Sequence, residues 1–408
     1  MSQYDGEMQQ PFSSRTNWDL NETAYAKAVR EARASGRRLY DLTLSNPTEC
    51  GFTFDQEEIL APLHNSAVLQ YQPEPRGLLP AREAVAQYYA DNKAEVNADE
   101  VLLTASTSEA YSFLFRLLCD AGDEVLVAQP SYPLFDFLAD LDDVRLKPYP
   151  LFYDYGWSID LHALEQGITP RTRAVLVVHP NNPTGQYASA TERQALEAIC
   201  ARHGLALIVD EVFLDYCISE SDAARAKAVS FAAGEHPVLT FVLSGLSKIA
   251  ALPQMKVAWI VTKGPAVPKR EALHRLEVIA DTFLSMSAPI QHALPHWLAG
   301  RDGIQRQILD RIRTNWQLAR KATESSEKVS CFDFDGGWSL VLKVAATESD
   351  KALALRLLEQ NGVLTHPGSF YGFPEAGQLV ISLIAKELDF REGLKILWEN
   401  LSGQMEPK

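Results

Sequence analysis

Polar side chains that could take part in catalysis follow five short apolar segments of this 408-residue chain. Lys248 comes soon after residues 238–243, and Asp210 comes directly after residues 205–209. A single lysine is weak evidence, because most lysines are solvated. A carboxylate that follows a buried strand needs a partner for its charge. The other three segments, residues 101–104, 124–128 and 174–178, are followed by Ser106, Thr107 and Ser108, by Tyr132, and by Asn182.

Each of these residues has an ordinary structural explanation when it is considered alone. Ser106 stands three residues before Glu109, which is the spacing of a helix N-cap, and an N-cap needs no ligand. Tyr132 could simply pack, and Asn182 lies in a proline-rich turn, where asparagine is common. Asp210 could be an N-cap or half of a buried ion pair. The argument for chemistry therefore depends on the combination.

Together, the same groups match the parts of one ligand. Backbone N–H groups and hydroxyls at a helix N-terminus suit a phosphate, and Tyr132 could lie flat against an aromatic ring. Asp210 could pair with a protonated pyridine nitrogen, and Lys248 could form a Schiff base with an aldehyde. Phosphate, planar ring, ring nitrogen and aldehyde are the functional groups of pyridoxal 5′-phosphate (PLP).

The order of the segments predicts how these residues come together. Short apolar runs alternate with helical segments, which indicates an α/β fold whose mostly parallel sheet is flanked by helices. Residues 257–261 are a sixth predicted strand. Ligands of open α/β sheets bind outside the carboxyl ends of the strands, so we expect the polar groups to meet at one edge.

The length of the chain predicts two domains of unequal size. Residues 291–326 read as one long, bent helical stretch, and the short strands and helices after it indicate a smaller α+β domain. We assign residues 1–45 to an N-terminal arm and small-domain segment, residues 46–290 to a large PLP-binding domain, and residues 291–408 to the small domain.

Composition argues against several kinds of partner and indicates a cellular compartment. The net charge of −15 argues against nucleic acid or an anionic membrane as the main partner. Five widely spaced cysteines indicate buried or free thiols in a reducing compartment. The first residues lack an apolar signal core, and no apolar run is long enough to span a membrane. We therefore expect a cytoplasmic protein.

The chain resembles the PLP-dependent class I/II aminotransferases over nearly its full length. The motifs that carry the resemblance occur in the family's order and spacing, and they are Asn46-Pro47-Thr48, Tyr71 with Gly77, Ser106-Thr107-Ser108-Glu109-Ala110, Pro130-Ser131-Tyr132-Pro133, Asn182-Pro183-Thr184-Gly185, Asp210-Glu211 and Ser247-Lys248. The resemblance implies the family's two-domain fold, PLP as the cofactor and a homodimer with shared sites.

The resemblance also implies a role for each matching residue. Lys248 would form the Schiff base with PLP and move a proton at the substrate, while Asp210 would keep the pyridine nitrogen protonated. Tyr71 would reach the phosphate in the neighbouring subunit. The implied cofactor-binding residues are Ser106, Thr107, Ser108, Tyr132, Asn182, Asp210, Phe213, Ser247, Lys248, Lys256 and Tyr71. The implied substrate-binding residues are Ser45, Asn182 and Arg15.

Three departures from the family pattern concern the cofactor. Phe213 stands where a tyrosine usually bonds the phenolic oxygen of PLP, so one hydrogen bond is lost. Lys256 stands where an arginine usually binds the phosphate, which keeps the charge but not the bidentate geometry. Ser106 stands where a glycine is common.

A fourth departure concerns the substrate. Val380 occupies the position of the arginine that usually binds the α-carboxylate, and a buried carboxylate without a cation is costly. Arg15, in the N-terminal arm, is a candidate substitute, although it could equally be a solvated arm residue. Trp338 and Phe370 could line the substrate pocket or belong to the core.

The leading hypothesis is an aminotransferase that moves an amino group between an amino acid and a 2-oxo acid. The closest alternative is a PLP-dependent lyase or decarboxylase on the same fold, because the expected arginine is replaced by Val380. A catalytically silent PLP-binding protein would not need to retain Lys248, Asp210 and Asn182 together. A nicotinamide enzyme is disfavoured, because no G-x-G-x-x-G follows the first strand.

Overall fold

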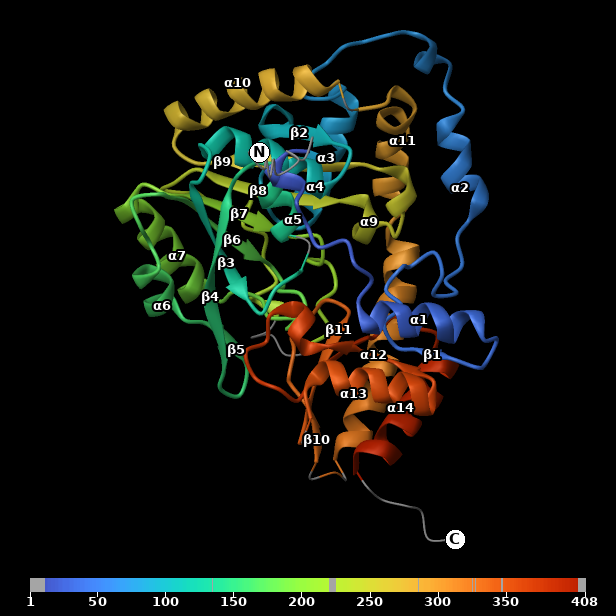
Figure 1. Ribbon diagram of the computed structural model, residues 1–408. Coiled ribbons are helices and arrows are strands. Elements are labelled where there is room, and N and C mark those ends of the chain that lie inside the picture. The colour runs from blue at the N-terminus through green and yellow to red at the C-terminus, as the bar shows by residue number, and fades with distance from the viewer. Residues whose placement is uncertain are drawn as a thin grey trace, which may run out of the picture.

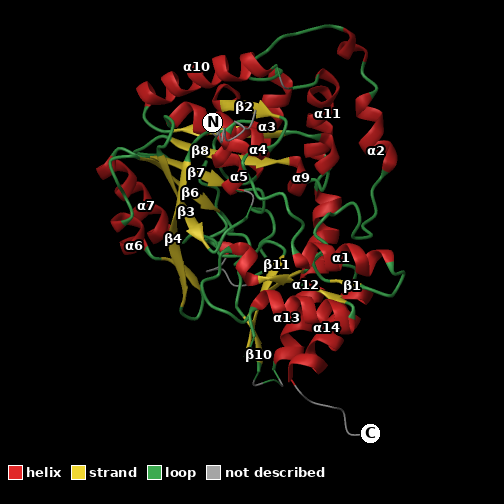
Figure 2. Cartoon of the chain, in the orientation of Figure 1, coloured by secondary structure: helices red, strands yellow, loops and turns green. Residues whose placement is uncertain are grey.

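The computed structural model describes residues 12–133, 135–219, 225–284, 286–324, 326, 328–345 and 348–402. An eight-stranded sheet with helices on both faces forms the upper part of the molecule in Figure 1, and a smaller group of helices and strands lies below it. Figure 2 shows the same division, with the strands of the large sheet enclosed by helices. The predicted α/β fold with a second, smaller α+β part is confirmed.

The large sheet has the strand order β2-β9-β8-β7-β6-β3-β4-β5. Neighbours from β8 through β4 run parallel, whereas β9 and β5 run antiparallel to the strands beside them. The strands are β2 (Val101–Thr104), β3 (Glu124–Gln129), β4 (Arg145–Tyr153), β5 (Trp157–Ile159), β6 (Thr172–Val178), β7 (Ala206–Asp210), β8 (Thr240–Gly245) and β9 (Ala258–Lys263).

Strand β9 runs antiparallel, because the connection before it holds no helix that could return the chain to the other end of the sheet. Only α9 (Leu246–Ile249) and one short 3-10 turn, Pro253–Met255, separate β8 from β9. The crossover before a parallel strand usually contains an α-helix that runs back along the sheet, and α9 has only four residues. The carboxyl ends of β2, β3, β6, β7 and β8 still lie at one edge.

Alternate residues of the buried strands pack into two cores, one on each face of the sheet. In β7, Leu207 and Val209 face one core, and Ala206 and Ile208 face the other. The first core receives side chains from α3 (Leu79–Asp91), α6 (Leu161–Gln166), α7 (Ala190–His203), α9 and α11 (Ala288–Ala299). The second receives them from α4 (Thr107–Leu118), α5 (Phe135–Leu141) and α10 (Ala266–Phe283).

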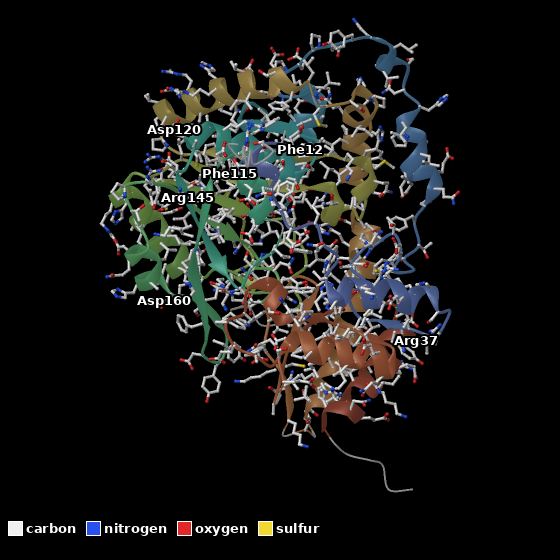
Figure 3. All side chains as sticks on the ribbon, viewed as in Figure 1. Phe12, Arg37, Phe115, Asp120, Arg145 and Asp160 are labelled. Atoms are coloured by element: carbon white, nitrogen blue, oxygen red, sulfur yellow. The ribbon has the colours of Figure 1, made fainter. Side chains whose placement is uncertain are left out.

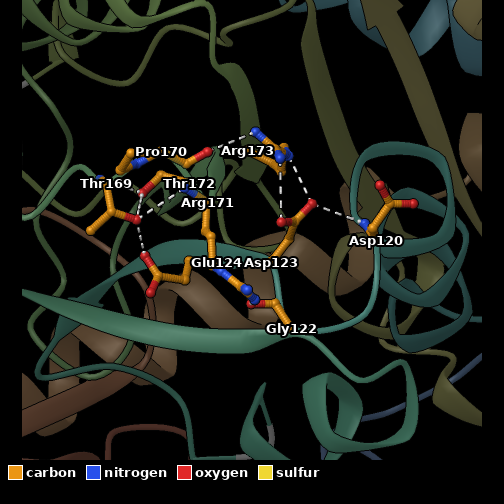
Figure 4. Close-up of polar contacts among 9 residues, drawn as sticks. All are labelled: Asp120, Gly122, Asp123, Glu124, Thr169, Pro170, Arg171, Thr172 and Arg173. Carbon is orange, nitrogen blue, oxygen red and sulfur yellow. Dashed lines mark hydrogen bonds and ion pairs between the residues drawn. The ribbon is translucent and has the colours of Figure 1, made fainter.

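Figure 3 shows how side chains fill the space between these layers. Phe115 of α4 is 1% exposed and lies in the second core, whereas Arg37 lies on the surface. The amino edge of the sheet is fixed by polar contacts instead (Figure 4). There, Arg173 Nε donates to Asp123 Oδ2 at 2.7 Å, and Thr169 Oγ1 donates to Glu124 Oε2 at 2.6 Å. These contacts join the starts of β3 and β6, at the edge opposite the carboxyl ends of the strands.

The smaller part is built on an antiparallel sheet of order β10-β11-β14-β13. Its strands are β10 (Val329–Cys331), β11 (Ser339–Val344), β13 (His366–Pro367) and β14 (Gln378–Ser382), and its helices are α12 (Asp302–Thr323), α13 (Asp350–Arg356) and α14 (Glu387–Ser402). Strand β1 (Tyr40–Asp41) pairs in parallel with β12 (Val363–Leu364). Leu42 and Cys50 therefore join the core of the C-terminal elements.

The remaining described α-helices are α1 (Ala24–Ala34) and α2 (Gln56–Leu60). The single bent helix expected over residues 291–326 is two helices, α11 and α12, which meet at Gly300 and Arg301. Helix α11 packs into the core of the large sheet, and α12 packs into the core of the smaller part. The proposed domain limit at residue 290 falls inside α11, and the domain limits stay a prediction. No helix in the described ranges is both long and apolar enough to cross a membrane.

Candidate active site

A cavity of about 590 Å³ lies where the carboxyl edge of the large sheet meets the smaller part. The large sheet contributes the residues after β2, β3, β6, β7 and β8, and the smaller part contributes residues from β11, β13 and β14. The predicted site residues that line the cavity are Ser45, Ser106, Thr107, Ser108, Tyr132, Asn182, Asp210, Phe213, Ser247, Lys248 and Lys256. The expectation that these groups meet at one edge therefore agrees with the geometry.

Lys248 lies on α9, directly beyond β8, and its amine faces aromatic rings. Its Nζ atom lies 4.8 Å from the ring centre of Trp338 and 5.6 Å from that of Phe213. Burial lowers the pKa of Lys248 to about 8, although the carboxylate of Asp210 acts in the opposite direction. The hydroxyl of Tyr216 donates to the backbone oxygen of Lys248 at 2.5 Å and holds α9 in place. The amine is thus closer to its neutral, nucleophilic form than a surface lysine.

Gly245 allows the close approach that sets the start of α9. A Cβ atom at this position would lie 2.8 Å from the Cβ of Ala258 and 3.0 Å from the backbone oxygen of Val257. Both Gly245 and Ala258 line the cavity. A side chain at residue 245 would therefore push β8 and β9 apart and displace Lys248.

Asp210 is buried at the end of β7 and has no ion pair among the described residues. Its Oδ2 accepts a hydrogen bond of 2.7 Å from the hydroxyl of Tyr111, and its Oδ1 accepts one of 3.0 Å from the N–H of Val212. Burial raises the pKa of Asp210, and these two hydrogen bonds and the charge of Lys248 oppose the rise. A cationic ligand atom at this place would stabilise the charged carboxylate.

The N-terminus of α4 forms the anion-binding end of the cavity. Ser106 acts as the N-cap, because its hydroxyl accepts the N–H of Glu109 at 3.1 Å. Thr107 and Ser108 line the cavity, and no hydrogen bond to their hydroxyls is found within the described ranges. Lys256 lines it as well, from a left-handed backbone position with φ of 51°. A helix N-terminus, two free hydroxyls and an ammonium group suit a phosphate.

Other side chains that line the cavity with Asp210 and the N-terminus of α4 could contact a ring. Asn182 accepts a hydrogen bond of 3.1 Å from the hydroxyl of Ser339 through Oδ1. Tyr132 is 41% exposed and packs edge-on against Phe135. Phe213 is buried and meets Trp338 edge-on at 4.9 Å, so the sequence position where the family has a tyrosine carries no hydroxyl here.

Two predicted residues do not line the cavity of this chain. Arg15 donates to the backbone oxygen of Leu141, and its Nε atom lies 3.7 Å from Oδ2 of Asp143. Tyr71 is 78% exposed and lies outside the cavity. The structure therefore does not bring Arg15 to the place left by the missing arginine, and the contribution of Tyr71 to a neighbouring subunit stays a prediction.

Sequence reasoning missed several cavity residues. It also missed Tyr111, which is buried behind the cavity wall and bonds Asp210; it follows Thr107 by four positions, so helical spacing alone could have placed it on the same face of α4. Trp338 and Phe370, which the sequence left between pocket and core, both line the cavity. His366 and Tyr371 carry no motif signal, because only the pairing of β13 with β14 brings them to the site.

Comparison with known proteins decides the family. The family model for aminotransferases of class I and II matches residues 55–389 of this chain. The chain belongs to the class I and II aminotransferase family. It is 27% identical to the glutamate–pyruvate aminotransferase AlaA of Escherichia coli K12, over 92% of this chain and 94% of that protein. It is also 27% identical to an alanine aminotransferase of Mycobacterium bovis, over 89% of this chain and 85% of that protein.

Solved structures agree with this assignment. An aminotransferase from Escherichia coli superposes with a TM-score of 0.85 at 25% identity, covering 98% of this chain and all of that one. The alanine aminotransferase of Pyrococcus furiosus has the same fold, with a TM-score of 0.84 at 22% identity over 96% of this chain and all of that one. The protein is therefore an aminotransferase that acts on amino acids and 2-oxo acids, and its cofactor is PLP.

The cavity fits this cofactor on grounds of its own chemistry. Asp210 is a buried carboxylate that forms no ion pair within the described ranges, and a pyridinium nitrogen would supply a cation in contact with it. Thr107 and Ser108 offer hydroxyls at the N-terminus of a twelve-residue helix for the phosphate. Lys248 offers an amine whose pKa is lowered. These groups match the ring nitrogen, the phosphate and the aldehyde of PLP.

Proposed function

We propose that Lys248 holds PLP and moves the proton at the α carbon of the substrate during amino-group transfer. The observation that carries this proposal is the position of Lys248: its amine lies at the carboxyl edge of the sheet, in the same cavity as Asp210 and the N-terminus of α4. Its lowered pKa supports the role, because a neutral amine can accept a proton at neutral pH.

The cofactor supplies an electron sink for the negative charge at the α carbon and carries the amino group between the two substrates. We assign Asp210 to the ring nitrogen, which its carboxylate keeps protonated. Thr107, Ser108 and Lys256 bind the phosphate through hydroxyl and ammonium donors. Asn182, whose side chain is positioned by Ser339, would bond the phenolic oxygen.

The remaining predicted residues complete this assignment. Tyr132 would stack on the ring, and we assign Ser106 and Ser247, which line the same cavity, to the cofactor as well. Phe213 covers the ring beside Trp338. We assign Ser45 and Asn182 to the substrate, since both line the cavity.

Alanine, glutamate and their oxo acids are the first substrates to test. This choice rests on the names of the relatives from Escherichia coli and Mycobacterium bovis. Val380 still stands where the family binds a carboxylate through arginine, and it is 2% exposed. The substrates of this chain must therefore be bound by other groups.

We further propose that the protein acts as a homodimer. The segment between α2 and α3 lies at the periphery of the molecule (Figure 1). Leu69 is 89% exposed and Tyr71 is 78% exposed, which is unusual for neighbouring apolar residues unless a partner covers them. In such a dimer, Tyr71 would reach the phosphate in the other subunit. The cytoplasmic location stays a prediction.

The test of Lys248 is a visible spectrum of the PLP-loaded protein during titration with alanine or glutamate. The amino form of the cofactor and one equivalent of oxo acid should appear together, and Lys248→Ala should abolish both. Sustained turnover of the donor without any oxo acid would instead favour the lyase or decarboxylase alternative. A Lys248→Ala protein that still converts the cofactor at the wild-type rate would contradict the role of Lys248.

A further inference from the structure

The face of β14 that borders the cavity shows what stands in place of the missing arginine. Val380 and Ser382 are two residues apart, so they point to the same face, and both line the cavity. Ile381 lies between them in the strand; it also borders the cavity, and its side chain packs into the core of the smaller part. On the neighbouring strand β13, His366 pairs directly with Val380. Side chains in such a pair lie about 5 Å apart at their Cβ atoms.

His366 has a free ring nitrogen beside this position. Its Nδ1 atom lies 3.1 Å from the hydroxyl of Tyr371, and both residues line the cavity. The side chain is only partly buried, and its Nε2 atom has no hydrogen-bond partner among the described residues. An imidazole held at one nitrogen can therefore present the other nitrogen to a ligand.

Ser382 gives a second, independent sign of a ligand at the same place. Its hydroxyl is buried and has no hydrogen-bond partner within the described ranges, although the residue borders the cavity. A buried hydroxyl normally has a partner, because leaving it unpaired costs free energy. The imidazole of His366 and the hydroxyl of Ser382 therefore lie next to Val380, and each can form a hydrogen bond with a ligand that bears oxygen atoms.

The basic residues of the cavity leave one candidate for a substrate carboxylate. The described lining contains Lys248, Lys256 and His366 as its basic side chains. The proposed function commits Lys248 to the cofactor's aldehyde and Lys256 to its phosphate. Arg15 is engaged with Leu141 and Asp143 outside the cavity.

We propose that protonated His366, together with the hydroxyl of Ser382, binds the α-carboxylate of the amino acid and of the 2-oxo acid. This proposal rests on the proposed function, since it names the carboxylate subsite of the same cavity. Tyr371 is a positioning residue, because its hydroxyl orients the imidazole through Nδ1.

The electrostatic surroundings of His366 give this subsite a pH dependence. Among the described residues, the titratable groups that act on it directly are Tyr371, at Nδ1, and Asp41 of β1. Tyr25 of α1 packs against Phe370, which contacts the imidazole, and Tyr132 acts on Tyr371. Burial lowers the pKa of His366, and the carboxylate of Asp41 opposes this effect. A bound carboxylate favours the protonated ring, so binding at neutral pH must take up a proton. Affinity for carboxylates should therefore fall as the pH rises above the pKa of free His366.

The first experiment measures binding without chemistry. Propionate is titrated into the PLP-loaded protein by calorimetry in two buffers of different ionisation enthalpy, at several pH values. We expect close to one proton taken up per site at pH 7.5, and an affinity that falls up to about tenfold per pH unit. Propionamide, which lacks the charge, should show neither effect. Binding of propionate without proton uptake would overturn the proposal even if every variant failed to fold.

The second experiment compares variants in the half-reaction, in which the amino acid converts the bound cofactor to its amino form. His366→Gln keeps a polar group but cannot become a cation, and we expect it to raise the dissociation constant of alanine about tenfold or more at pH 6.5. Its effect on alaninamide should be small, and the pH dependence seen with alanine should disappear. Ser382→Ala should weaken alanine binding severalfold and leave the pH dependence in place. Equal effects of His366→Gln on alanine and alaninamide would refute the assignment.

The two proposals fail in different ways. If the protein were not the proposed aminotransferase, neither alanine nor alaninamide would convert the cofactor to its amino form. Binding of propionate would still be accompanied by uptake of a proton by the protein. If the carboxylate subsite were wrong, the half-reaction would proceed with alanine while His366→Gln left its dissociation constant and pH profile unchanged.

Discussion

At the scale of single residues, the ionisation of Lys248 controls how the site captures PLP. Only the neutral amine attacks an aldehyde, and burial lowers the pKa of Lys248 to about 8. We expect the rate of PLP capture by the apo protein to rise with pH and to level off above about 8, as read from the visible cofactor band. Asp210→Asn should move this midpoint to lower pH, because the carboxylate raises the pKa of Lys248. A rate that keeps rising to the pKa of an exposed lysine would contradict this.

Phe213 offers a second test at this scale. A tyrosine hydroxyl at this position would donate to the phenolic oxygen of the cofactor and stabilise its negative charge. Phe213→Tyr should therefore lower the pKa at which the visible band of the bound cofactor changes. Phe213→Leu, which adds no donor, serves as the control. An equal shift in both variants would show that packing against Trp338, not the hydrogen bond, sets this pKa.

At the scale of elements, the first turn of α4 divides two tasks between adjacent residues. Ser106 caps the helix through the N–H of Glu109, while Thr107 presents its hydroxyl to the cavity. Ser106→Ala should lower the free energy of unfolding by about 1 kcal/mol and change PLP affinity little. Thr107→Val should weaken PLP binding roughly tenfold or more and leave stability nearly unchanged. Melting temperatures and PLP titrations of the two variants check this, and the reverse pattern would reject it.

At the scale of the whole molecule, Asp215 joins the two parts of the chain. It accepts hydrogen bonds from Tyr88 of α3, at 3.2 Å, and from Gln305 of α12, at 2.9 Å. Burial raises its pKa to about 6, and the charge of Arg301 opposes this rise. The folded protein thus binds this proton more tightly than the unfolded chain does.

This coupling predicts a pH dependence of stability. Between the ordinary pKa of aspartate and about 6, the folded state holds more protons, so its stability falls as the pH rises through this window. The slope from one group is at most ~1.4 kcal/mol per pH unit. Asp215→Asn should remove this group's contribution to the pH dependence of the free energy of unfolding over this range, since the amide does not titrate. Urea unfolding at several pH values measures the change. A variant that keeps the full wild-type slope would contradict the role of Asp215.

The sequence by itself determined which residues gather at the cofactor end of the site. Lys248, Asp210, Asn182 and Thr107 each follow a buried strand, and parallel strands bring their carboxyl ends to one edge. Local spacing was therefore enough to predict both the fold class and this half of the cavity. The strand direction of β9 was not predicted, because an apolar run reads the same in either direction.

Only the tertiary structure decided what stands at the substrate end. His366 reaches the cavity because β13 pairs with β14 in a register that sets it opposite Val380, and no local pattern encodes that pairing. Arg15 was a reasonable candidate by charge, but the path of the N-terminal arm takes it to Asp143. Contacts between residues far apart in sequence depend on how whole elements pack, and the types of the residues do not reveal that packing in advance.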